Sequence, residues 1–231
     1  MRVQKPATIY LLRHGHSTAN AKSILAGRDA SVSLSPRGIE QAQAVMHELG
    51  EIKFAKIYSS PMPRCLETLR PLAGKSKLKI EKDDGLIEME YGDWSGKKLL
   101  ALSRKKMWSE IQARPSLVRF PNGESFLEMQ GRALESVKSL AIPGAEILVC
   151  SHGDVIKAII AGVIGTHLDH FQKIVIDPAS ISILDFTGKD YRVLTLNNTS
   201  TEIKSFLASS GSKKQAARAL LGGGAGRTGK R

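Results

Sequence analysis

Short apolar runs alternate with segments of helical periodicity along most of this chain. Residues 8–12, 56–58, 78–80 and 146–150 are apolar or β-branched runs of strand length. The segments between them carry apolar residues three or four positions apart, which is the spacing of one helix face. Strands that alternate with helices predict an α/β fold with a mostly parallel central sheet and helices on both faces, in three layers (α/β/α).

The clearest helix signals lie in residues 35–50. Ser35 suits the N-cap, Pro36 suits the first helical position, and Gly50 follows the last turn. The residues of this helix expected to face the core are Ile39, Ala42, Val45, Met46 and Leu49. The other predicted elements are a helix over 65–73 that ends at Gly74 and late strands over 174–176, 181–186 and 192–196.

Composition agrees with a folded and reduced domain. The chain has 231 residues, of which 42% are hydrophobic and 24% charged, as in one large α/β domain. Cys65 and Cys150 are too few and too far apart for a disulfide framework, and no Cys/His cluster has the spacing of metal ligands. No signal peptide is indicated, and polar residues interrupt the most apolar stretch, 146–164. A cytoplasmic protein without a membrane span is therefore expected.

The basic character is concentrated near the C-terminal end. Residues 204–231 contain seven Lys and Arg and no acidic residue, and removing these seven charges from the formal net charge of +12 leaves +5. We therefore predict a single domain over 1–203 followed by a flexible basic tail over 204–231. Nucleic acid is not expected as a partner, and contact of the tail with nucleic acid or an acidic partner is the less favoured interpretation. The oligomeric state is left open.

Polar residues follow three of the predicted parallel strands. Arg13 and His14 come directly after the first strand, Arg64 after the second, and His152 after the strand at 146–150. Ligands of open α/β sheets bind beyond the carboxyl ends of the strands, so these side chains should converge on one edge of the sheet. This convergence is the central structural prediction.

Two arginines and two histidines at one edge form a site suited to a phosphate dianion. Arginine grips phosphate oxygens with a planar fork and stays charged at any working pH. A neutral imidazole can attack phosphorus, and the cations stabilise the charge on the oxygens during transfer. Gly15 and Gly153 are expected to let backbone N–H groups approach the anion.

An acid must protonate the leaving oxygen. Glu88, in the segment 85–96, is the candidate, with Glu90 and Asp93 as nearby alternatives. Ser125, in a Gly-Glu-Ser sequence before an apolar helix, is either a helix cap or part of the site.

Five motifs in order carry a resemblance to a known family. They are RHGHSTAN (13–20), SSPMPRCLET (59–68), GLIEMEYGDWSG (85–96), NGESFLEMQGR (122–132) and SHGDVIKAII (151–160). In this order they resemble the histidine phosphatase superfamily, also called phosphoglycerate mutase-like, over about residues 7–187. The resemblance implies an enzyme that needs neither a metal nor another cofactor. It implies His14 as the nucleophile, Arg13, Arg64 and His152 around the phosphate, Glu88 as the proton donor and Asn20 as a further phosphate contact.

The favoured function is hydrolysis of a small anionic phosphorylated metabolite through a phosphohistidine. In the resembling mutases a longer insertion lies between the acid segment and the Gly-Glu-Ser helix, whereas the stretch here is short. Hydrolysis is therefore favoured, and a phosphoglycerate-type mutase is the alternative. A non-catalytic phospho-ligand binder is less favoured, because binding alone needs neither nucleophile nor acid. The substrate stays open, since His16 stands where the family often has Glu or Gln.

The stretch 97–120 holds seven basic residues and one acid, Glu110. The spacing of Leu99, Leu102, Met107 and Ile111 predicts a short helical cap over the site. We expect one or two of its basic side chains to select substrates with a second anionic group, although a solvated basic helix face explains most of them equally well.

Overall fold

A six-stranded mixed sheet forms the centre of the molecule. The computed structural model describes residues 5–199. The strand order is β3-β2-β4-β1-β5-β6; the first four of these are parallel, and β5 and β6 are antiparallel to their neighbours. The strands are β1 (Ala7–Arg13), β2 (Lys56–Ser59), β3 (Ile80–Lys82), β4 (Glu146–Ser151), β5 (Ile181–Phe186) and β6 (Tyr191–Asn198). The predicted three-layer α/β fold with a mostly parallel sheet is confirmed.

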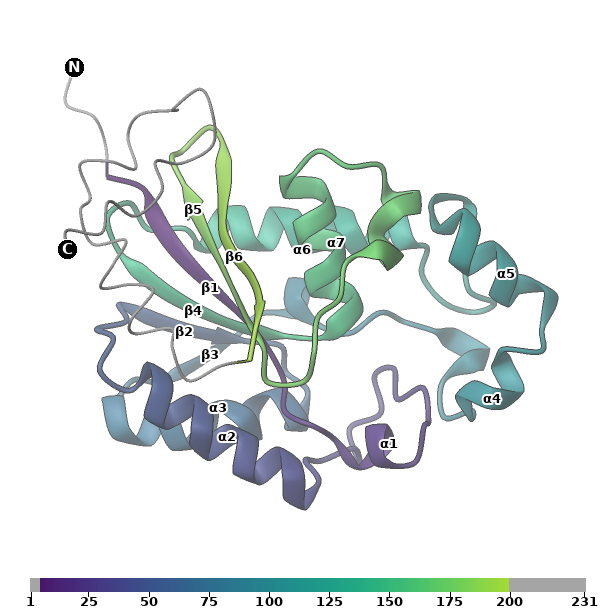
Figure 1. The fold of residues 1–231 in the computed structure, drawn as a ribbon, viewed down its shortest axis with the longest axis horizontal. Coiled ribbons are helices and arrows are strands. Elements are labelled where there is room, and N and C mark those ends of the chain that lie inside the picture. Colours follow the sequence, from purple (N-terminus) through teal and green to yellow (C-terminus); the bar gives the residue numbers. More distant parts are fainter. Residues whose placement is uncertain (1–4, 200–231) are drawn as a thin grey trace, which may run out of the picture. The chain divides into compact units, whose positions relative to one another are not determined.

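Helices cover both faces of the sheet (Figure 1). On one face lie α2 (Pro36–Leu49) and α3 (Pro63–Ser76), and on the other α6 (Phe126–Leu140) and α7 (Gly153–Val163). Beyond the carboxyl ends of the parallel strands lie α1 (Thr18–Ala21), α4 (Leu99–Leu102) and α5 (Lys106–Ala113). The short 3-10 helices are η1 (Asp84–Leu86), η2 (Gly92–Trp94), η3 (Pro115–Leu117) and η4 (Leu168–Lys173).

Helix α2 begins as predicted, but fewer of its apolar residues are buried than predicted. The Ser35 side chain caps it by accepting from the Gly38 N–H, with Pro36 in the first turn. The predicted core residues Ala42, Val45 and Leu49 are buried, whereas Ile39 is 57% exposed. The prediction for Ile39 was wrong because the stripe that faces α3 and the sheet starts at Gly38, one position round the helix.

Helix α3 is longer than predicted at both ends. It continues past Gly74 to Ser76, and the left-handed residue that ends it is Lys77, with φ 57°. Gly74 does not end the helix because it keeps helical geometry, and the left-handed conformation falls on Lys77 instead. The strand expected at 78–80 lies two residues later, as β3.

The strand predicted over 174–176 is wrong. These residues form a connection between η4 and β5 without strand pairing. The Ile176 carbonyl accepts a hydrogen bond from the Arg13 side chain at 2.6 Å, so the backbone here bonds to a strand-end side chain instead of a neighbouring strand.

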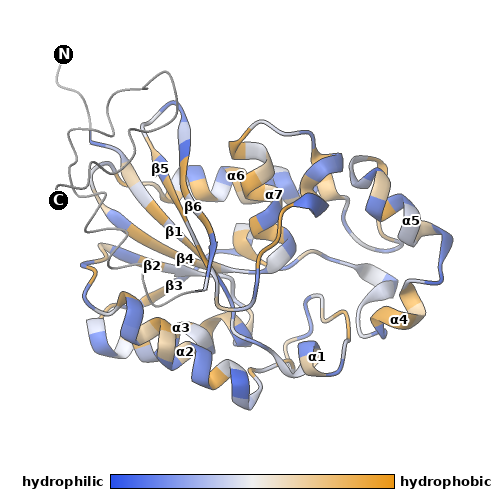
Figure 2. Ribbon diagram, in the orientation of Figure 1, coloured by the Kyte–Doolittle hydropathy of each residue, from blue (hydrophilic) through white to orange (hydrophobic). Residues whose placement is uncertain are grey.

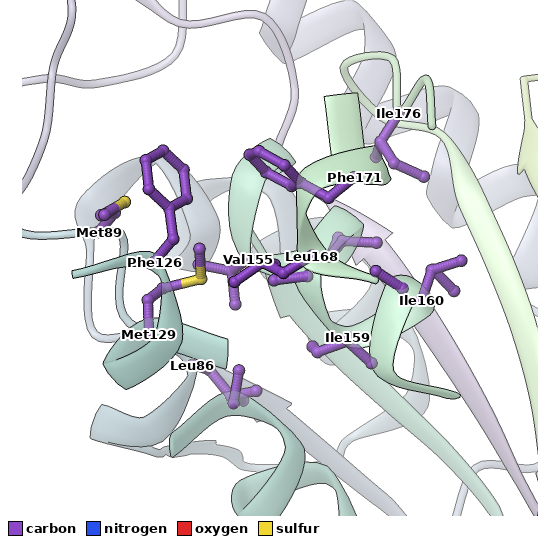
Figure 3. Packing of buried hydrophobic residues seen from close by; sticks show 14 of the residues in the cluster. Leu86, Met89, Phe126, Met129, Val155, Ile159, Ile160, Leu168, Phe171 and Ile176 are labelled. Atoms are coloured by element: carbon purple, nitrogen blue, oxygen red, sulfur yellow. The ribbon is translucent and has the colours of Figure 1, made fainter. Parts of the chain in front are cut away.

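The main hydrophobic core lies between the sheet and the helix pair α6 and α7. Apolar residues of the central strands and of α7 contribute to it (Figure 2). Figure 3 shows Met129 and Phe126 from α6 against Val155 of α7, with Phe171 beside them; the Phe126 and Phe171 rings meet edge to face at 5.1 Å. Among the described residues, no helix is long and apolar enough to cross a membrane. Residues 204–231, predicted to be a basic tail, lie outside the described residues.

Candidate active site

The parallel pair β1 and β4 brings two histidines together. Arg13 pairs with Ser151 in the strand register, so His14 and His152 follow at the same level. The His14 N–H donates to the Ser151 carbonyl at 3.0 Å. The two imidazole rings lie 5.2 Å apart, centroid to centroid, at an interplanar angle of 62°. The expected convergence of the strand ends is present.

Both arginines stand at this edge with unpaired donors. Arg64, in the first turn of α3, is 1% exposed and donates through Nη2 to the Gly27 carbonyl at 2.8 Å. Its Nη1 is buried without a partner, and so is Nε of Arg13. Among residues 5–199, neither guanidinium has a carboxylate within ion-pair distance. Buried unpaired donors are rare and costly in folded proteins, so two of them on cations mark an anion site.

His14 has one ring nitrogen free for chemistry. Its Nδ1 lies 2.7 Å from the Gly15 carbonyl. A carbonyl only accepts, so Nδ1 carries the proton and Nε2 of the neutral ring carries the lone pair. Burial, followed by the charges of Arg64 and Arg13, holds the pKa of His14 well below its usual value. The ring is 4% exposed and lines a cavity, so it is a neutral imidazole with an unprotonated nitrogen near pH 7.

His152 is held from both sides. Its Nε2 lies 2.8 Å from the Ser60 hydroxyl, and its Nδ1 lies 3.2 Å from Arg64 Nη2 and 3.6 Å from Glu88 Oε2. Because the guanidinium can only donate, Nδ1 accepts and Nε2 donates to Ser60. Burial and the charge of Arg64 lower the pKa of His152 well below its usual value. The ring is fully buried and does not line the cavity, so direct phosphate binding by His152 stays a prediction.

Among the three candidate acids, only Glu88 lines the cavity. Burial raises the pKa of Glu88 to about 7, and nearby Asp154 adds to the rise. Glu90 instead pairs with Arg28 at 3.4 Å, and Asp93 accepts from Asn122 at 3.1 Å. A carboxyl group with a pKa near neutrality is suited to donate a proton.

The Gly-Glu-Ser sequence holds the backbone of this acid in place. Arg28 and Arg132 both donate to the Glu88 carbonyl, at 2.9 and 3.2 Å. Glu124 accepts from both arginines, at 3.2 and 2.6 Å. Ser125 caps α6 and shares a capping box with Glu128, away from the cavity, as in the helix-cap alternative. Sequence reasoning missed both arginines: Arg132 ends the motif at 122–132 without a predicted contact, and nothing in the local pattern distinguishes Arg28 from a surface arginine.

The two glycines of the His-Gly pairs have different surroundings. Gly153 lines the cavity, and a Cβ added there would lie 3.2 Å from the Arg13 guanidinium. Gly15 donates its N–H to the Thr68 hydroxyl at 2.9 Å, and a Cβ there would meet the Gly38 carbonyl at 2.9 Å. The expectation that Gly15 presents its N–H to the anion was wrong, because the bond to Thr68 uses that donor and the glycine permits close packing on α2.

Asn20 and His16 both follow the turn at His14 and Gly15, but only Asn20 lines the cavity. Asn20 lines the cavity, and its Oδ1 accepts from the Ser17 N–H and hydroxyl at 2.9 Å each. Oδ1 is thereby fixed and the amide NH₂ is left as the donor for a ligand. His16 is bonded through Nδ1 to the Ser35 hydroxyl at 2.9 Å and does not line the cavity.

The cavity measures about 430 Å³ and has a polar wall that sequence reasoning missed. The Tyr91 hydroxyl donates to Asp154 at 2.7 Å, and the Lys157 ammonium lies 3.3 Å from Asp154 and 2.9 Å from the Gln172 amide oxygen. Asp154 and Lys157 belong to the first turns of α7 directly after His152, which is the signal that could have indicated them. None of the seven basic residues of 97–120 lines the cavity, and Leu99 is the residue of that stretch that does.

Cys65 and Cys150 are free and buried. The Cys65 sulfur lies 3.6 Å from His152 Nε2, so it packs behind the histidine pair. Among the described residues, no group of three or more His, Cys, Asp or Glu side chains could hold a metal ion.

Comparisons with known proteins show to which family the sequence is similar. The family model described as histidine phosphatase superfamily (branch 1) matches residues 9–199. Phosphoserine phosphatase 1 of Hydrogenobacter thermophilus is 30% identical over 199 residues, which are 83% of this chain and 92% of that protein. A 2,3-bisphosphoglycerate-dependent phosphoglycerate mutase of Mesorhizobium japonicum is 31% identical over 72% of this chain and 86% of its own length.

Solved structures show the same fold. Bacillus stearothermophilus YhfR superposes with a TM-score of 0.80 at 29% identity, covering 84% of this chain and 98% of its own. The alpha-ribazole phosphatase of Shigella flexneri superposes with a TM-score of 0.73 at 26% identity, covering 83% and 96%.

Proposed function

The chain belongs to the histidine phosphatase superfamily, and from this premise we propose that it hydrolyses phosphomonoesters through a phosphohistidine formed on His14. The observation that carries the proposal is the set of unpaired donors on Arg13 and Arg64 beside a neutral His14 whose Nε2 is free. A phosphate dianion between the two guanidinium groups would satisfy those donors and place phosphorus next to the lone pair.

Two displacements at phosphorus complete the reaction. In the first, Nε2 of His14 bonds to phosphorus while the ester P–O bond breaks, and the leaving oxygen takes the proton of the Glu88 carboxyl group. In the second, a water oxygen bonds to phosphorus while the P–N bond breaks. The Glu88 carboxylate takes the proton of that water, and inorganic phosphate leaves. The guanidinium groups stabilise the charge on the phosphoryl oxygens in both steps.

The chain's other residues have supporting roles in this proposal. Asn20 and Gly153 line the cavity beside the arginines, where the Asn20 amide can donate to a phosphoryl oxygen. His152 contacts both Arg64 and Glu88, so it holds the cation and the acid in register for the transfer. Direct contact of His152 with the phosphate is part of the proposal.

Hydrolysis is favoured over phosphoryl transfer to a second substrate. A mutase must hold its phosphohistidine away from water while the substrate reorients. Here Val175, on the wall of the cavity, is 62% exposed, so the cavity opens to water. The similarity to phosphoglycerate mutases keeps mutase activity as the alternative. A substrate in the class of small phosphorylated molecules follows from the names of the relatives.

Turnover of p-nitrophenyl phosphate in the presence of a chelator tests the proposal. The wild-type protein should release p-nitrophenol, and His14→Ala should not. Absence of turnover of any phosphomonoester by the wild type would leave a phospho-ligand binder as the explanation. Appearance of 2-phosphoglycerate from 3-phosphoglycerate, faster than release of inorganic phosphate, would support the mutase.

A further inference from the structure

The acid Glu88 lies in a segment that belongs to no helix or strand. It follows η1 and precedes η2, and residues 87–91 form no regular element. Its Oε1 accepts from the Met89 N–H at 3.0 Å, and its Oε2 lies 3.6 Å from His152 Nδ1, beyond hydrogen-bond distance. A proton donor works only when it is held close to the leaving oxygen. The position of this acid therefore depends on what holds its backbone.

Arg28 reaches this backbone from a distant part of the chain. It lies in the connection between α1 and α2 and does not line the cavity. Its Nε donates to the Glu88 carbonyl at 2.9 Å and its Nη2 to the Glu124 carboxylate at 3.2 Å. Its Nη1 lies 3.4 Å from Glu90 Oε2. A planar guanidinium with three such partners fixes the peptide more closely than a single contact would.

The loop that carries this arginine also bonds to a phosphate-binding cation. The Gly27 carbonyl accepts from Arg64 Nη2 at 2.8 Å. The loop has backbone bonds of its own to the segment before α4, where the Gly96 N–H donates to the Leu25 carbonyl at 2.8 Å. Loss of the Arg28 side chain should therefore release the acid and leave the cation in place.

We propose that Arg28 is a positioning residue for the proton donor, which holds the Glu88 backbone so that its carboxyl group meets the leaving oxygen. The inference rests on the proposed function, in which Glu88 supplies that proton. Because Arg28 lies outside the cavity, it acts on the reaction through Glu88. Its effect should grow with the need of the leaving group for a proton.

A series of substituted phenyl phosphates, from 4-nitrophenyl to 4-methoxyphenyl phosphate, tests this dependence. The nitrophenolate leaves without a proton and the methoxyphenolate needs one, and kcat/KM reports the step in which the ester bond breaks. Arg28→Ala should lower kcat/KM about tenfold to a hundredfold for 4-methoxyphenyl phosphate, but about threefold or less for 4-nitrophenyl phosphate. Equal losses with every ester would overturn the inference and leave the phosphatase proposal intact. Absence of turnover of every ester by the wild-type protein would instead remove the proposed function.

Arg119→Ala is the matched control. Arg119 also donates to a carbonyl of the Gly-Glu-Ser segment, that of Gly123 at 3.3 Å, and pairs with Glu128. None of its hydrogen bonds within residues 5–199 reaches Glu88. Its removal should leave kcat/KM for each ester within about twofold of the wild-type value. A loss that depends on the leaving group in Arg119→Ala as in Arg28→Ala would contradict a specific role of Arg28.

Two further variants separate positioning from a general loss of structure. Arg28→Ala combined with Glu88→Gln should cost little more than Glu88→Gln alone, because two residues that act through one group are not additive. A further loss of about tenfold in the double variant would contradict the proposal. Arg28→Lys keeps the charge and one bond to the Glu88 carbonyl, so its loss for 4-methoxyphenyl phosphate should be intermediate. If Arg28→Ala does not fold, as judged by circular dichroism, Arg28→Lys decides: a dependence on the leaving group identical to that of the wild type would overturn the inference.

Discussion

The two His-Gly turns of this molecule have nearly the same sequence and different surroundings. Each follows a buried parallel strand, and the strands are in register. His14 has one nitrogen tied to its own turn and the other free at the cavity. His152 has partners at both nitrogens and no exposed surface. A strand end fixes where a histidine lies, but the bonds from neighbouring elements decide whether it can react.

The same contrast extends to the glycines that follow. Gly15 lies against the backbone of α2, and Gly153 lies under the guanidinium of Arg13. The first turn is therefore held by the scaffold, while the second forms part of the anion site. Five variants break or sharpen this contrast, and they are ordered by the size of their expected effects.

Replacing the free imidazole should have the largest effect. His14→Asn removes the nucleophile, so kcat/KM for any phosphomonoester should fall by about 10⁴-fold or more. Rapid quenching with a ³²P-labelled substrate should trap acid-labile, base-stable phosphoprotein in the wild type and none in the variant. Labelled phosphohistidine in His14→Asn, or full labelling at His152, would reverse the roles assigned to the two turns.

Removing the acid should give the next largest effect, and one that depends on pH. Burial raises the pKa of Glu88 to about 7, so its donating, protonated form is lost as pH rises through 7. The wild-type kcat/KM for alkyl phosphates should therefore fall above about pH 7. Glu88→Gln should lower it by about 10³-fold and abolish that alkaline limb. The loss should be far smaller for p-nitrophenyl phosphate, whose leaving oxygen needs no proton.

Stability provides an independent check on Glu88. Its folded pKa of about 7 lies above the ordinary value of 4.5, so the native state binds more protons between these values and unfolding free energy falls as pH rises through them. The shift corresponds to about 3 kcal/mol. Relative to the wild type, Glu88→Gln should gain stability from pH 4 to pH 8 in urea unfolding. A pH-independent difference would show that the carboxyl group titrates normally.

Loosening the buried histidine should cost less than removing the free one. His152→Asn keeps an acceptor near Arg64 but loses the bond from Nε2 to Ser60. Misplacement of Arg64 and Glu88 should lower kcat/KM by about 10²-fold. Labelled phosphohistidine should still form on His14, more slowly, and that readout separates a positioning residue from a nucleophile. Complete loss of label in a folded His152→Asn protein would contradict the distinction between the turns.

The sequence predicts the positions of these groups better than their environments. Strand runs such as 146–150 and the capping pattern at Ser35 are local signals, so the sheet edge that holds Arg13, His14 and His152 follows from them. The free ring nitrogen of His14 does not follow from these signals, because it depends on the hydrogen bond between Nδ1 and the Gly15 carbonyl. The motif resemblance alone favours Glu88 over Glu90 as the acid. The structure gives the physical reason: Glu88 is buried, whereas Glu90 forms an ion pair with Arg28.

The errors have a common cause in long-range contacts. Residues 174–176 read as a strand because they are apolar, yet their side chains line the cavity and the Ile176 carbonyl binds Arg13. Lys157 and Gln172 are far apart in sequence and meet only after α7 and η4 pack together. No spacing rule covers a bond between side chains of different elements, so the position of Asp154 and Lys157 after His152 could indicate these two residues but not their partner Gln172.

The two glycines offer the smallest and most selective test of the comparison. In Gly153→Ala the new methyl group would lie 3.2 Å from the Arg13 guanidinium, a flexible group that can shift by a few tenths of an ångström. KM for phosphomonoesters should rise about tenfold with little change in unfolding free energy. In Gly15→Ala the methyl group would meet the Gly38 backbone oxygen at 2.9 Å, which cannot move alone. Unfolding free energy should then fall by about 2 kcal/mol, as in other overpacked sites. Steady-state kinetics and urea unfolding of both variants decide the matter: a loss of stability in Gly153→Ala equal to that in Gly15→Ala would mean that both turns are scaffold, and that the anion site begins at the arginines alone.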